Sequence, residues 1–166
     1  GKFFDLLQKY HGLGERERLL LRLAAILHDC GKFISMSAPG ECAYQIIMST
    51  EILGISHMER EMVASIVRYN TMELPNFNEF DGKLGNDEYL IVMKLAAILR
   101  VCNALDRSHR QKFADMKLTI KDSNIVITTA YPDNITLEKK TLQDKQDFFE
   151  EVYGLGFEIK QKKKKQ

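Results

Sequence analysis

The hydrophobic period of this chain changes once, near Phe113, and that change constrains the fold more than any other feature. Before it, apolar residues such as Leu19, Leu23 and Ile26 recur every three or four positions, which predicts helices with one buried face. After it, apolar and polar residues alternate over 116–121, which is typical of a strand. The sequence therefore predicts a mainly α fold, a helical bundle followed by a small α+β subdomain.

Cap and turn residues delimit the helices expected in the first two-thirds of the chain. Gly31 stands just after the last apolar turn and is expected to end the first helix. A second helix is expected over 43–53, with Gly54 as its end. Ser56 and Glu59 have the spacing of a capping box, which predicts that a third helix starts there. Its buried stripe would be Met62, Ile66 and Tyr69.

The segment 71–86 has no clear hydrophobic period and is predicted to be a loop. Phe77 and Phe80 within it are candidates for contact with a partner, or else for folding back on the core. The next stretch, 87–107, is apolar nearly all round, which is typical of a central helix packed on several sides. Its polar exceptions fall on a single line: Arg100, Asn103, Arg107 and Arg110.

The last third of the chain is expected to form a hairpin, a helix and a third strand. Thr141 is the expected N-cap of that helix and Gly154 its stop. The expected segments are a strand over 116–121, a turn at 122–124, a return strand over 125–129, a helix over 141–152 and a third strand over 155–160.

The composition is that of an ordinary globular domain. Of the 166 residues, 45% are hydrophobic and 28% are charged, and no apolar run is long enough to span a bilayer. Three cysteines at spacings unsuited to a zinc knuckle indicate reduced thiols and a cytoplasmic setting. The chain begins in what resembles the second half of a helix, with Phe3 and Phe4, so we expect a fragment of a longer protein.

The charge is concentrated at one end. Five lysines lie in the last seven residues, so the rest of the chain carries a formal charge of −4 rather than the overall +1. A body of this charge is no general polyanion binder, and we expect neither nucleic acid nor a membrane as a partner. Any anion site must be local, and the tail 161–166 is expected to be solvated and disordered.

A histidine and an aspartate stand side by side where the first helical run ends, in His28-Asp29-Cys30-Gly31-Lys32. Adjacent imidazole and carboxylate groups can hold a divalent metal, and a metal can activate water against a phosphate ester. The pair is the centre of the His-Asp phosphohydrolase motif, but a working site needs further ligands elsewhere in the chain.

Four segments together resemble the C-terminal half of the exopolyphosphatase/guanosine pentaphosphate phosphatase (Ppx/GppA) family. They are YHGLGERE at 10–17, LAAILHDCGKFIS at 23–35, EMVASIVRY at 61–69 and LAAILRVCNALDRSH at 95–109. The resemblance covers essentially the whole chain. It implies a His-Asp-like helical domain over 1–112, with its first helix truncated, and a small α+β subdomain over 113–160.

The resemblance also implies a function for the parent enzyme and a lesser one for this part. In the family, actin-like domains at the N-terminus use magnesium to hydrolyse terminal phosphates of polyphosphate or guanosine pentaphosphate. Neither a glycine-rich phosphate loop nor their acidic residue set is found in this sequence. The chain would then be non-catalytic and without a cofactor of its own. Its partners would be the actin-like domains, a second copy in a homodimer, and polyphosphate.

The ligands of a working His-Asp site are only partly matched. His28, Asp29 and Asp106 correspond to that pattern, whereas Cys42 and Asn70 stand at positions expected to hold histidine. This degenerate set is too small for a closed metal site, although Cys42 could serve zinc. The alternative is that the three matching residues form a buried, charge-paired cluster in which an arginine or Lys32 partners an aspartate.

Basic residues near the helix ends are candidates for phosphate contact. They are Lys32, Arg68, Arg100, Arg107 and Arg110. A row of guanidinium and ammonium groups suits a linear polyphosphate, because arginine offers each phosphate a bidentate contact. Alternatively each pairs with a local acid, as Arg68 would with Glu61 or Glu73.

Two other functions stay open from the residues. The chain could be an autonomous His-Asp phosphohydrolase that acts on nucleotides through a bound metal, or a scaffold that binds neither metal nor phosphate. His57 and His109 are expected to be structural, and Cys30 and Cys102 to be small core residues.

Overall fold

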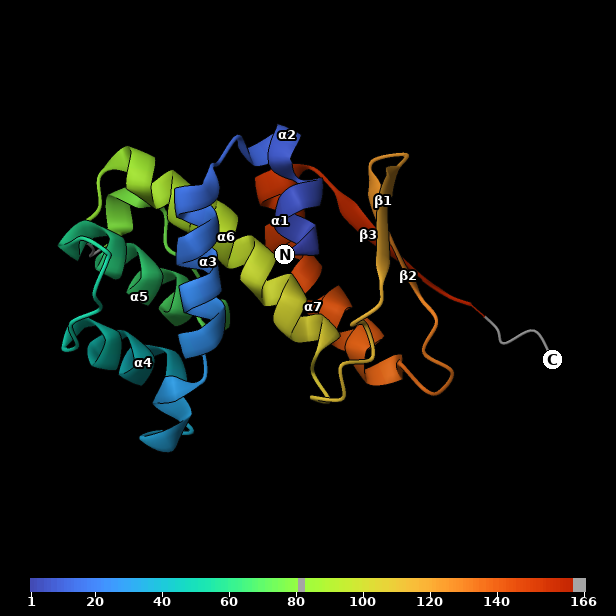
Figure 1. Ribbon diagram of the computed structural model, residues 1–166, viewed down its shortest axis with the longest axis horizontal. Helices are drawn as coiled ribbons and strands as arrows, with labels where there is room; N and C mark the ends of the chain where they lie inside the picture. Colours follow the sequence, from blue (N-terminus) through green and yellow to red (C-terminus); the bar gives the residue numbers. More distant parts are fainter. Residues whose placement is uncertain (81–82, 163–166) are drawn as a thin grey trace. The chain divides into compact units, whose positions relative to one another are not determined.

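The structure is a computed structural model that describes residues 1–80 and 83–162 (Figure 1). It is mostly helical with one three-stranded sheet, which confirms the predicted fold class. Its internal contacts define two compact units, which we describe separately. The helical unit comprises residues 12–99, and the mixed unit comprises residues 1–11 together with the chain from residue 100 onward. The predicted domains 1–112, 113–160 and 161–166 stay a prediction.

The helical unit is built around α5. Both α3 and α4 pack against α5, and their buried residues are mainly aliphatic, such as Leu20, Ile47 and Ile66. Its elements are α3 (Glu15–Leu27), the 3-10 turn η1 (Cys30–Phe33), α4 (Pro39–Met48), α5 (His57–Thr71), the 3-10 turn η2 (Phe77–Glu79) and the first part of α6 (Asn86–Leu105).

Two glycines let backbones meet at the start of α4. A Cβ on Gly31 would lie 1.9 Å from the Pro39 carbonyl oxygen and 2.6 Å from the Ala43 nitrogen. A Cβ on Gly40 would lie 2.7 Å from the Arg68 carbonyl oxygen. The expectation that Gly31 ends a helix is therefore wrong, because α3 already ends at Leu27. Gly31 is needed because a residue without a Cβ lets this backbone pack closely against α4.

The helix starts were predicted with unequal success. The capping box of α5 is confirmed, because the Glu59 N–H donates to Ser56 Oγ at 3.2 Å and the Ser56 N–H donates to Glu59 Oε2 at 2.7 Å. The start of α4 was placed too late, at 43 instead of Pro39. Proline suits the first turn of a helix, where its missing N–H costs nothing, and that signal was overlooked.

The central helix and the loop before it are as expected. Residues 95–99 of α6 are all buried, so this part of the helix is covered on every side. The loop aromatics fold back: the Phe77 and Phe80 rings each lie 5.4 Å from the Tyr89 ring, and Phe80 lies 5.7 Å from Tyr69. Residues 81–82 of the loop lie outside the described residues.

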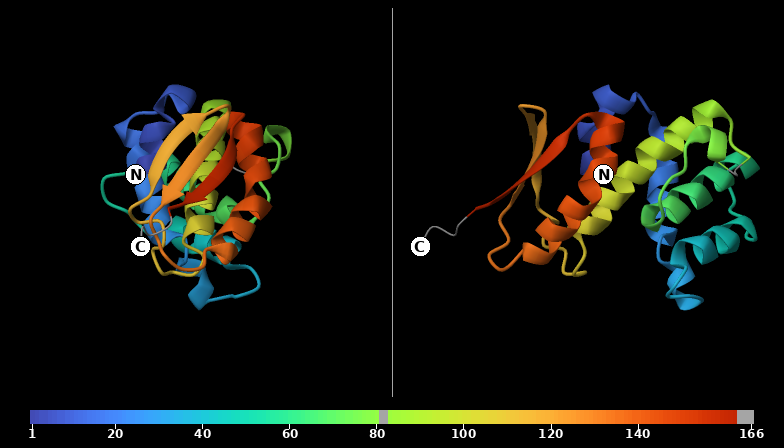
Figure 2. Two further views of the ribbon diagram at one scale, coloured as in Figure 1. Left: turned by 90° about the vertical axis from the view of Figure 1, so that its right-hand side faces the viewer. Right: turned by 180° about the vertical axis from the view of Figure 1, so that it is seen from behind.

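The mixed unit carries the sheet. Strand β1 pairs antiparallel with β2, and β2 pairs parallel with β3, in the order β1-β2-β3 (Figure 2). The connection from β2 to β3 is helix α7, as parallel neighbours require. The elements are α1 (Lys2–Leu6), α2 (Gln8–His11), the end of α6, β1 (Lys117–Lys121), β2 (Asn124–Thr129), α7 (Thr136–Tyr153) and β3 (Gly156–Gln161).

The core of the mixed unit joins the two ends of the chain. The Phe149 ring of α7 lies 4.7 Å from the Phe157 ring of β3, and Phe3 of α1 meets Phe157 edge-on at 6.4 Å. Lys2 Nζ donates to the carbonyl oxygens of Ala114 and Met116 at 3.0 and 2.9 Å. Residues 1–11 are therefore part of this core, which the order of the sequence does not suggest.

The hairpin is confirmed, and the last helix is longer than predicted. Asp122 and Ser123 both adopt positive φ, as a tight two-residue hairpin requires. Helix α7 begins at Thr136, so Thr141 is an interior residue whose hydroxyl donates to the Leu137 carbonyl at 2.8 Å rather than a cap. Gly154 ends the helix in the left-handed conformation, as expected.

Two further expectations concern the tail and the membrane. Of the tail, residues 163–166 lie outside the described residues, and Gln161 still belongs to β3. In the described chain, none of the helices combines the length and the apolar character that crossing a membrane demands.

Candidate functional site: the His-Asp motif and the arginine loop

The His-Asp pair lies where α3 gives way to η1. The His28 ring donates from Nδ1 to the Ala25 carbonyl at 2.7 Å, and its Nε2 lies 3.3 Å from Asp29 Oδ1. The same Asp29 oxygen pairs with Lys32 Nζ at 2.6 Å. One of the expected local partners, Lys32, is therefore confirmed, and its ammonium balances the charge of the Asp29 carboxylate.

The prediction of a buried cluster is wrong. The His28 side chain is 24% exposed and Asp29 39% exposed, so both lie at the surface, where an ion pair is weak. Asp106 belongs to the mixed unit, where its Oδ1 accepts the Gln111 N–H at 3.1 Å. This contact fixes the turn that follows α6.

The remaining positions of the degenerate set do not complete a metal centre. Cys42 is half-buried in α4, and Asn70 is buried in α5. Within residues 1–80 and 83–162, histidine, cysteine and acidic side chains nowhere gather in a group of three or more that could hold a metal ion. The residues described here therefore do not fit a magnesium or zinc site.

Arg68 is held by a cluster between α4 and α5. Its Nη2 pairs with Glu41 Oε2 at 2.7 Å, and its guanidinium lies over the Tyr44 ring at 5.0 Å. The expected acid partners were Glu61 or Glu73, so the kind of partner was predicted correctly and its identity was not. Glu61 instead accepts a hydrogen bond from the Tyr44 hydroxyl. Burial and the neighbouring Glu61 both raise the pKa of Tyr44, which keeps this hydroxyl a neutral donor.

The single polar line of arginines is broken in the structure. Arg100 lies on α6, with its guanidinium 4.3 Å from the centre of the Phe148 ring of α7. Because α6 ends at Leu105, Arg107 and Arg110 lie beyond the helix. Lys32 and Arg68 belong to the helical unit, and the other three basic residues to the mixed unit.

Arg107 and Arg110 are presented by a loop of fixed shape, residues 106–112, which we call the arginine loop. Its backbone is anchored by Asp106, whose carbonyl accepts the His109 N–H at 2.8 Å. His109 and Gln111 adopt positive φ, which is strained for residues with a side chain. Both arginines are exposed and neither forms a hydrogen bond or ion pair with the described residues.

A buried ion pair supports the arginine loop from below. Lys112 Nζ lies 3.1 Å from Glu138 Oε2, and the Ser108 hydroxyl donates to Glu138 Oε1 at 2.6 Å. The side chains are 10% and 0% exposed for lysine and glutamate. Burial opposes the charge of Glu138, but the hydrogen bonds from Ser108 and Lys112 outweigh it and lower the pKa of this carboxyl.

A hollow of about 360 Å³ opens beside the arginine loop. Lys112 also donates to the Asn134 carbonyl at 2.8 Å, which fixes one wall of the hollow. Because Lys112 pairs with Glu138, Arg110 is the cation available to a ligand there, and the exposed acid Asp133 also lines the hollow. The lining residues are Arg110, Lys112, Tyr131, Asp133, Asn134, Thr136 and Leu137.

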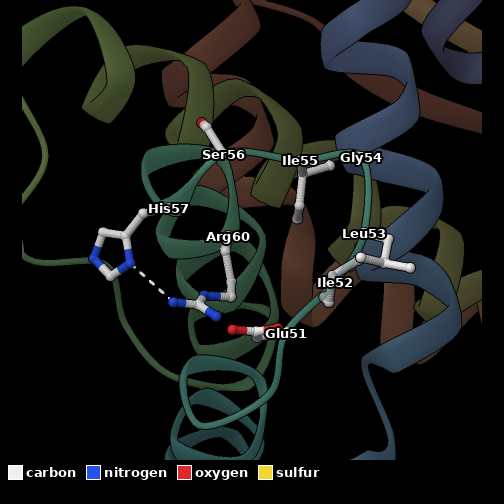
Figure 3. Close-up of a pocket in the computed structure, with 8 residues that line it drawn as sticks. All are labelled: Glu51, Ile52, Leu53, Gly54, Ile55, Ser56, His57 and Arg60. Carbon is white, nitrogen blue, oxygen red and sulfur yellow. Dashed lines mark hydrogen bonds between the residues drawn. The ribbon is translucent and has the colours of Figure 1, made fainter.

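A second hollow, of about 280 Å³, lies at the turn between α4 and α5 (Figure 3). Arg60 reaches across it, donating to the Thr50 carbonyl at 2.6 Å and to His57 Nδ1 at 2.9 Å. Arg16 holds the same turn by donating to the Gly54 carbonyl at 2.7 Å. These contacts satisfy carbonyl groups of the turn itself, so the polar groups here support the turn. The role expected of His57 is structural, and its contact with Arg60 agrees with that.

The expectation that Cys30 and Cys102 are core residues is wrong, and the structural role expected of His109 stays a prediction. Cys102 is exposed and Cys30 is only partly buried, so neither is a core residue. His109 lies past the helix end and is largely exposed. His11 is the buried histidine of the chain's described part: its Nε2 lies 2.9 Å from the Phe4 carbonyl, and its ring packs on the Phe4 ring.

Comparison with known proteins settles the family. Residues 2–147 match the family described as Ppx/GppA phosphatase, domain III. The chain belongs to this family. The match covers most of the chain and corresponds to the family's C-terminal region, as the sequence motifs predicted. A search of curated proteins found no match to the chain.

Sequence reasoning missed the buried pair under the arginine loop. Lys112 and Glu138 are 26 residues apart and lie in different predicted elements. The one local signal was a glutamate, Glu138, at a core-facing position of α7. That signal needs the true start of α7, which had been placed five residues too late.

Proposed function

We propose that this Ppx/GppA domain III is a non-catalytic module that gives its parent phosphatase a contact for polyphosphate through the arginine loop. The parent would hydrolyse the terminal phosphate of polyphosphate or of guanosine pentaphosphate in other domains, with magnesium held there. The observation that carries the proposal is the pair of exposed arginines without an acidic partner, Arg107 and Arg110, on a loop whose shape is fixed from below.

The local structure supports anion contact at this loop. A guanidinium that is not already paired can donate two parallel hydrogen bonds to a phosphate. The loop needs no rearrangement to present them, because Asp106 and the Ser108–Glu138 contact hold its backbone. Lys32, Arg68 and Arg100 are proposed as weaker contributors, since the first two pair with acids and the third lies over Phe148.

The autonomous metal-dependent phosphohydrolase is the weaker candidate. It needs a metal at His28 and Asp29, but Lys32 pairs with Asp29, and no group of three or more possible metal ligands forms among the described residues. No observation on the described residues favours it, so we do not propose it for this chain.

Titration calorimetry of the chain with long-chain polyphosphate tests the proposal. The double variant Arg107→Gln/Arg110→Gln should bind about tenfold more weakly, because the two lost charge-assisted contacts are exposed and are together worth roughly 1.4 kcal/mol. Binding by the unmodified chain should weaken as salt rises, since the contact is exposed and charge-driven.

A matched control separates the loop from general positive charge. Arg22 is an exposed arginine of α3 in the helical unit, so Arg22→Gln removes one charge away from the arginine loop. Its affinity for polyphosphate should stay close to that of the unmodified chain. Equal losses in Arg22→Gln and in either single loop variant would refute the loop as the contact.

A further inference from the structure

Three highly exposed apolar side chains of the helical unit occur together, directly after the His-Asp pair. Phe33 is 93% exposed, Ile34 67% and Met36 80%. Ile26, in the last turn of α3, is 77% exposed. We call residues 33–36 the apolar loop. Scattered exposed apolar residues are normal, but this many within four positions mark an interaction surface.

The apolar loop is held in one shape by its backbone. The Ile34 and Ser35 N–H groups donate to the Gly31 carbonyl at 3.1 and 3.0 Å, and Gly31 itself is buried against α4. Ser35 Oγ accepts the Ala38 N–H at 3.2 Å. A surface that is already ordered loses little conformational entropy when it docks, which favours binding.

The charge beside the apolar loop is balanced. Asp29 and Lys32 pair with each other at 2.6 Å, so this flank of the loop carries no net charge. A strongly charged partner would gain nothing here and would lose hydration. The chemistry therefore fits an apolar, uncharged partner surface.

The exposed area of the apolar loop indicates whether its partner is a second copy of the chain or another domain of the same polypeptide. Three large side chains offer roughly 500 Å² of surface. A stable dimer needs about 800 Å² from each partner. Interfaces between domains of one chain are often smaller, because the tether supplies a high effective concentration. The match to a numbered domain of a multidomain family provides such a neighbour.

We propose that the apolar loop docks against another domain of the same polypeptide, through an apolar and uncharged surface on that domain. This inference rests on the proposed function in one respect, namely that the chain is part of a larger phosphatase. The docking would fix the helical unit of domain III to its neighbour through Phe33, Ile34 and Met36.

Hydrogen–deuterium exchange compares the peptide spanning 32–37 in this 166-residue chain and in the complete polypeptide. Exchange should be about tenfold slower in the complete polypeptide, at every protein concentration, because a docked segment opens less often. The double variant Phe33→Ser/Met36→Ser should return exchange to the rate of the isolated chain.

Leu53→Ser is the matched control, since Leu53 is 95% exposed in the same unit but lies at the turn between α4 and α5. It should leave the protection of 32–37 unchanged. Equal exchange in the two proteins would overturn the proposal, and so would protection that is already present in the isolated chain. Protection that rises with concentration would assign the surface to a second copy and would overturn it too. None of these readouts involves polyphosphate, so a failed docking test leaves the proposed function standing.

Discussion

At the residue scale, neighbouring groups decide what the His-Asp motif does. Asp29 forms an ion pair with Lys32, and the His28 ring donates a hydrogen bond to a backbone carbonyl. Gly31 packs closely against the backbone at the start of α4. The residues that define the motif in the sequence are thus used for local structure. Their chemistry is determined by the contacts that they make with Lys32, the Ala25 carbonyl and the start of α4.

Replacing Gly31 tests the close approach of η1 to α4. Gly31→Ala would place a Cβ 1.9 Å from the Pro39 carbonyl oxygen, so the backbones must separate, at a cost of about 3 kcal/mol in the free energy of unfolding. Gly14→Ala is the control, because the nearest atom would be 3.4 Å away. Denaturant unfolding measures both, and equal stabilities would contradict the packing described here.

Replacing Glu138 tests the buried support of the arginine loop. Glu138→Gln leaves the Lys112 ammonium buried without a counter-charge and should cost about 3 kcal/mol in thermal or denaturant unfolding. Glu158→Gln breaks a pair with Lys160 in which both side chains are 53% exposed, and should cost less than about 0.5 kcal/mol. A similar loss in the two variants would show that the Lys112 pair is not buried.

Residue contacts were predictable where they are local. The capping box of Ser56 and Glu59 spans four positions, and its spacing alone identified it. Arg68 was expected to pair with Glu61 or Glu73, but it pairs with Glu41, 27 positions back on another helix. No spacing rule selects such a partner, because packing of α4 on α5 determines it.

At the element scale, α3 is tied to the start of α5 by charge. Arg16 on α3 holds the Glu59 carboxylate through its Nη2 at 2.8 Å and through Nε as well. Glu59 also closes the capping box, so one carboxylate joins two helices. The hydrogen bond from Arg16 and that from the Ser56 N–H lower the pKa of Glu59 to about 2.

That lowered pKa predicts how stability depends on pH. The stabilisation is complete above the ordinary carboxyl pKa near 4.5 and is lost as the pH falls through about 2. Glu59→Gln should therefore show a shallower fall in stability between pH 5 and pH 2 than the unmodified chain. Denaturant midpoints at several pH values measure this, and parallel curves would contradict the ion pair.

Element types were more predictable than element starts. Helix α6 and the hairpin followed from strong periodicity and turn chemistry, which act locally. The predicted starts of α4 and α7 lie four and five residues too late, since neither helix has a side-chain cap to mark its first turn. In α4 the local signal is Pro39 in the first turn, and α7 offers no comparable signal.

At the scale of the whole molecule, the first eleven residues join the mixed unit rather than the helices that follow them. Phe3 and Phe4 are buried at 2% exposure, and Phe3 meets Phe157 across more than 150 positions. Helical periodicity correctly indicated a buried face there. It contains no information about which distant element covers that face.

Replacing Asp29 separates the module from a metal-dependent enzyme. If the His-Asp pair has only a structural role, Asp29→Ala in the complete polypeptide should leave kcat for phosphate release from polyphosphate within about twofold. The lost Lys32 pair is exposed and of small effect on stability. Abolished turnover with an intact fold, checked by circular dichroism, would assign chemistry to this pair.

Steady-state kinetics of the complete polypeptide with Arg107→Gln/Arg110→Gln tests most directly whether the arginine loop binds substrate without taking part in the chemistry. The account predicts that KM for long-chain polyphosphate rises about tenfold while kcat stays unchanged, because the loop contributes equally to the ground and transition states. A fall in kcat with KM unchanged would contradict it.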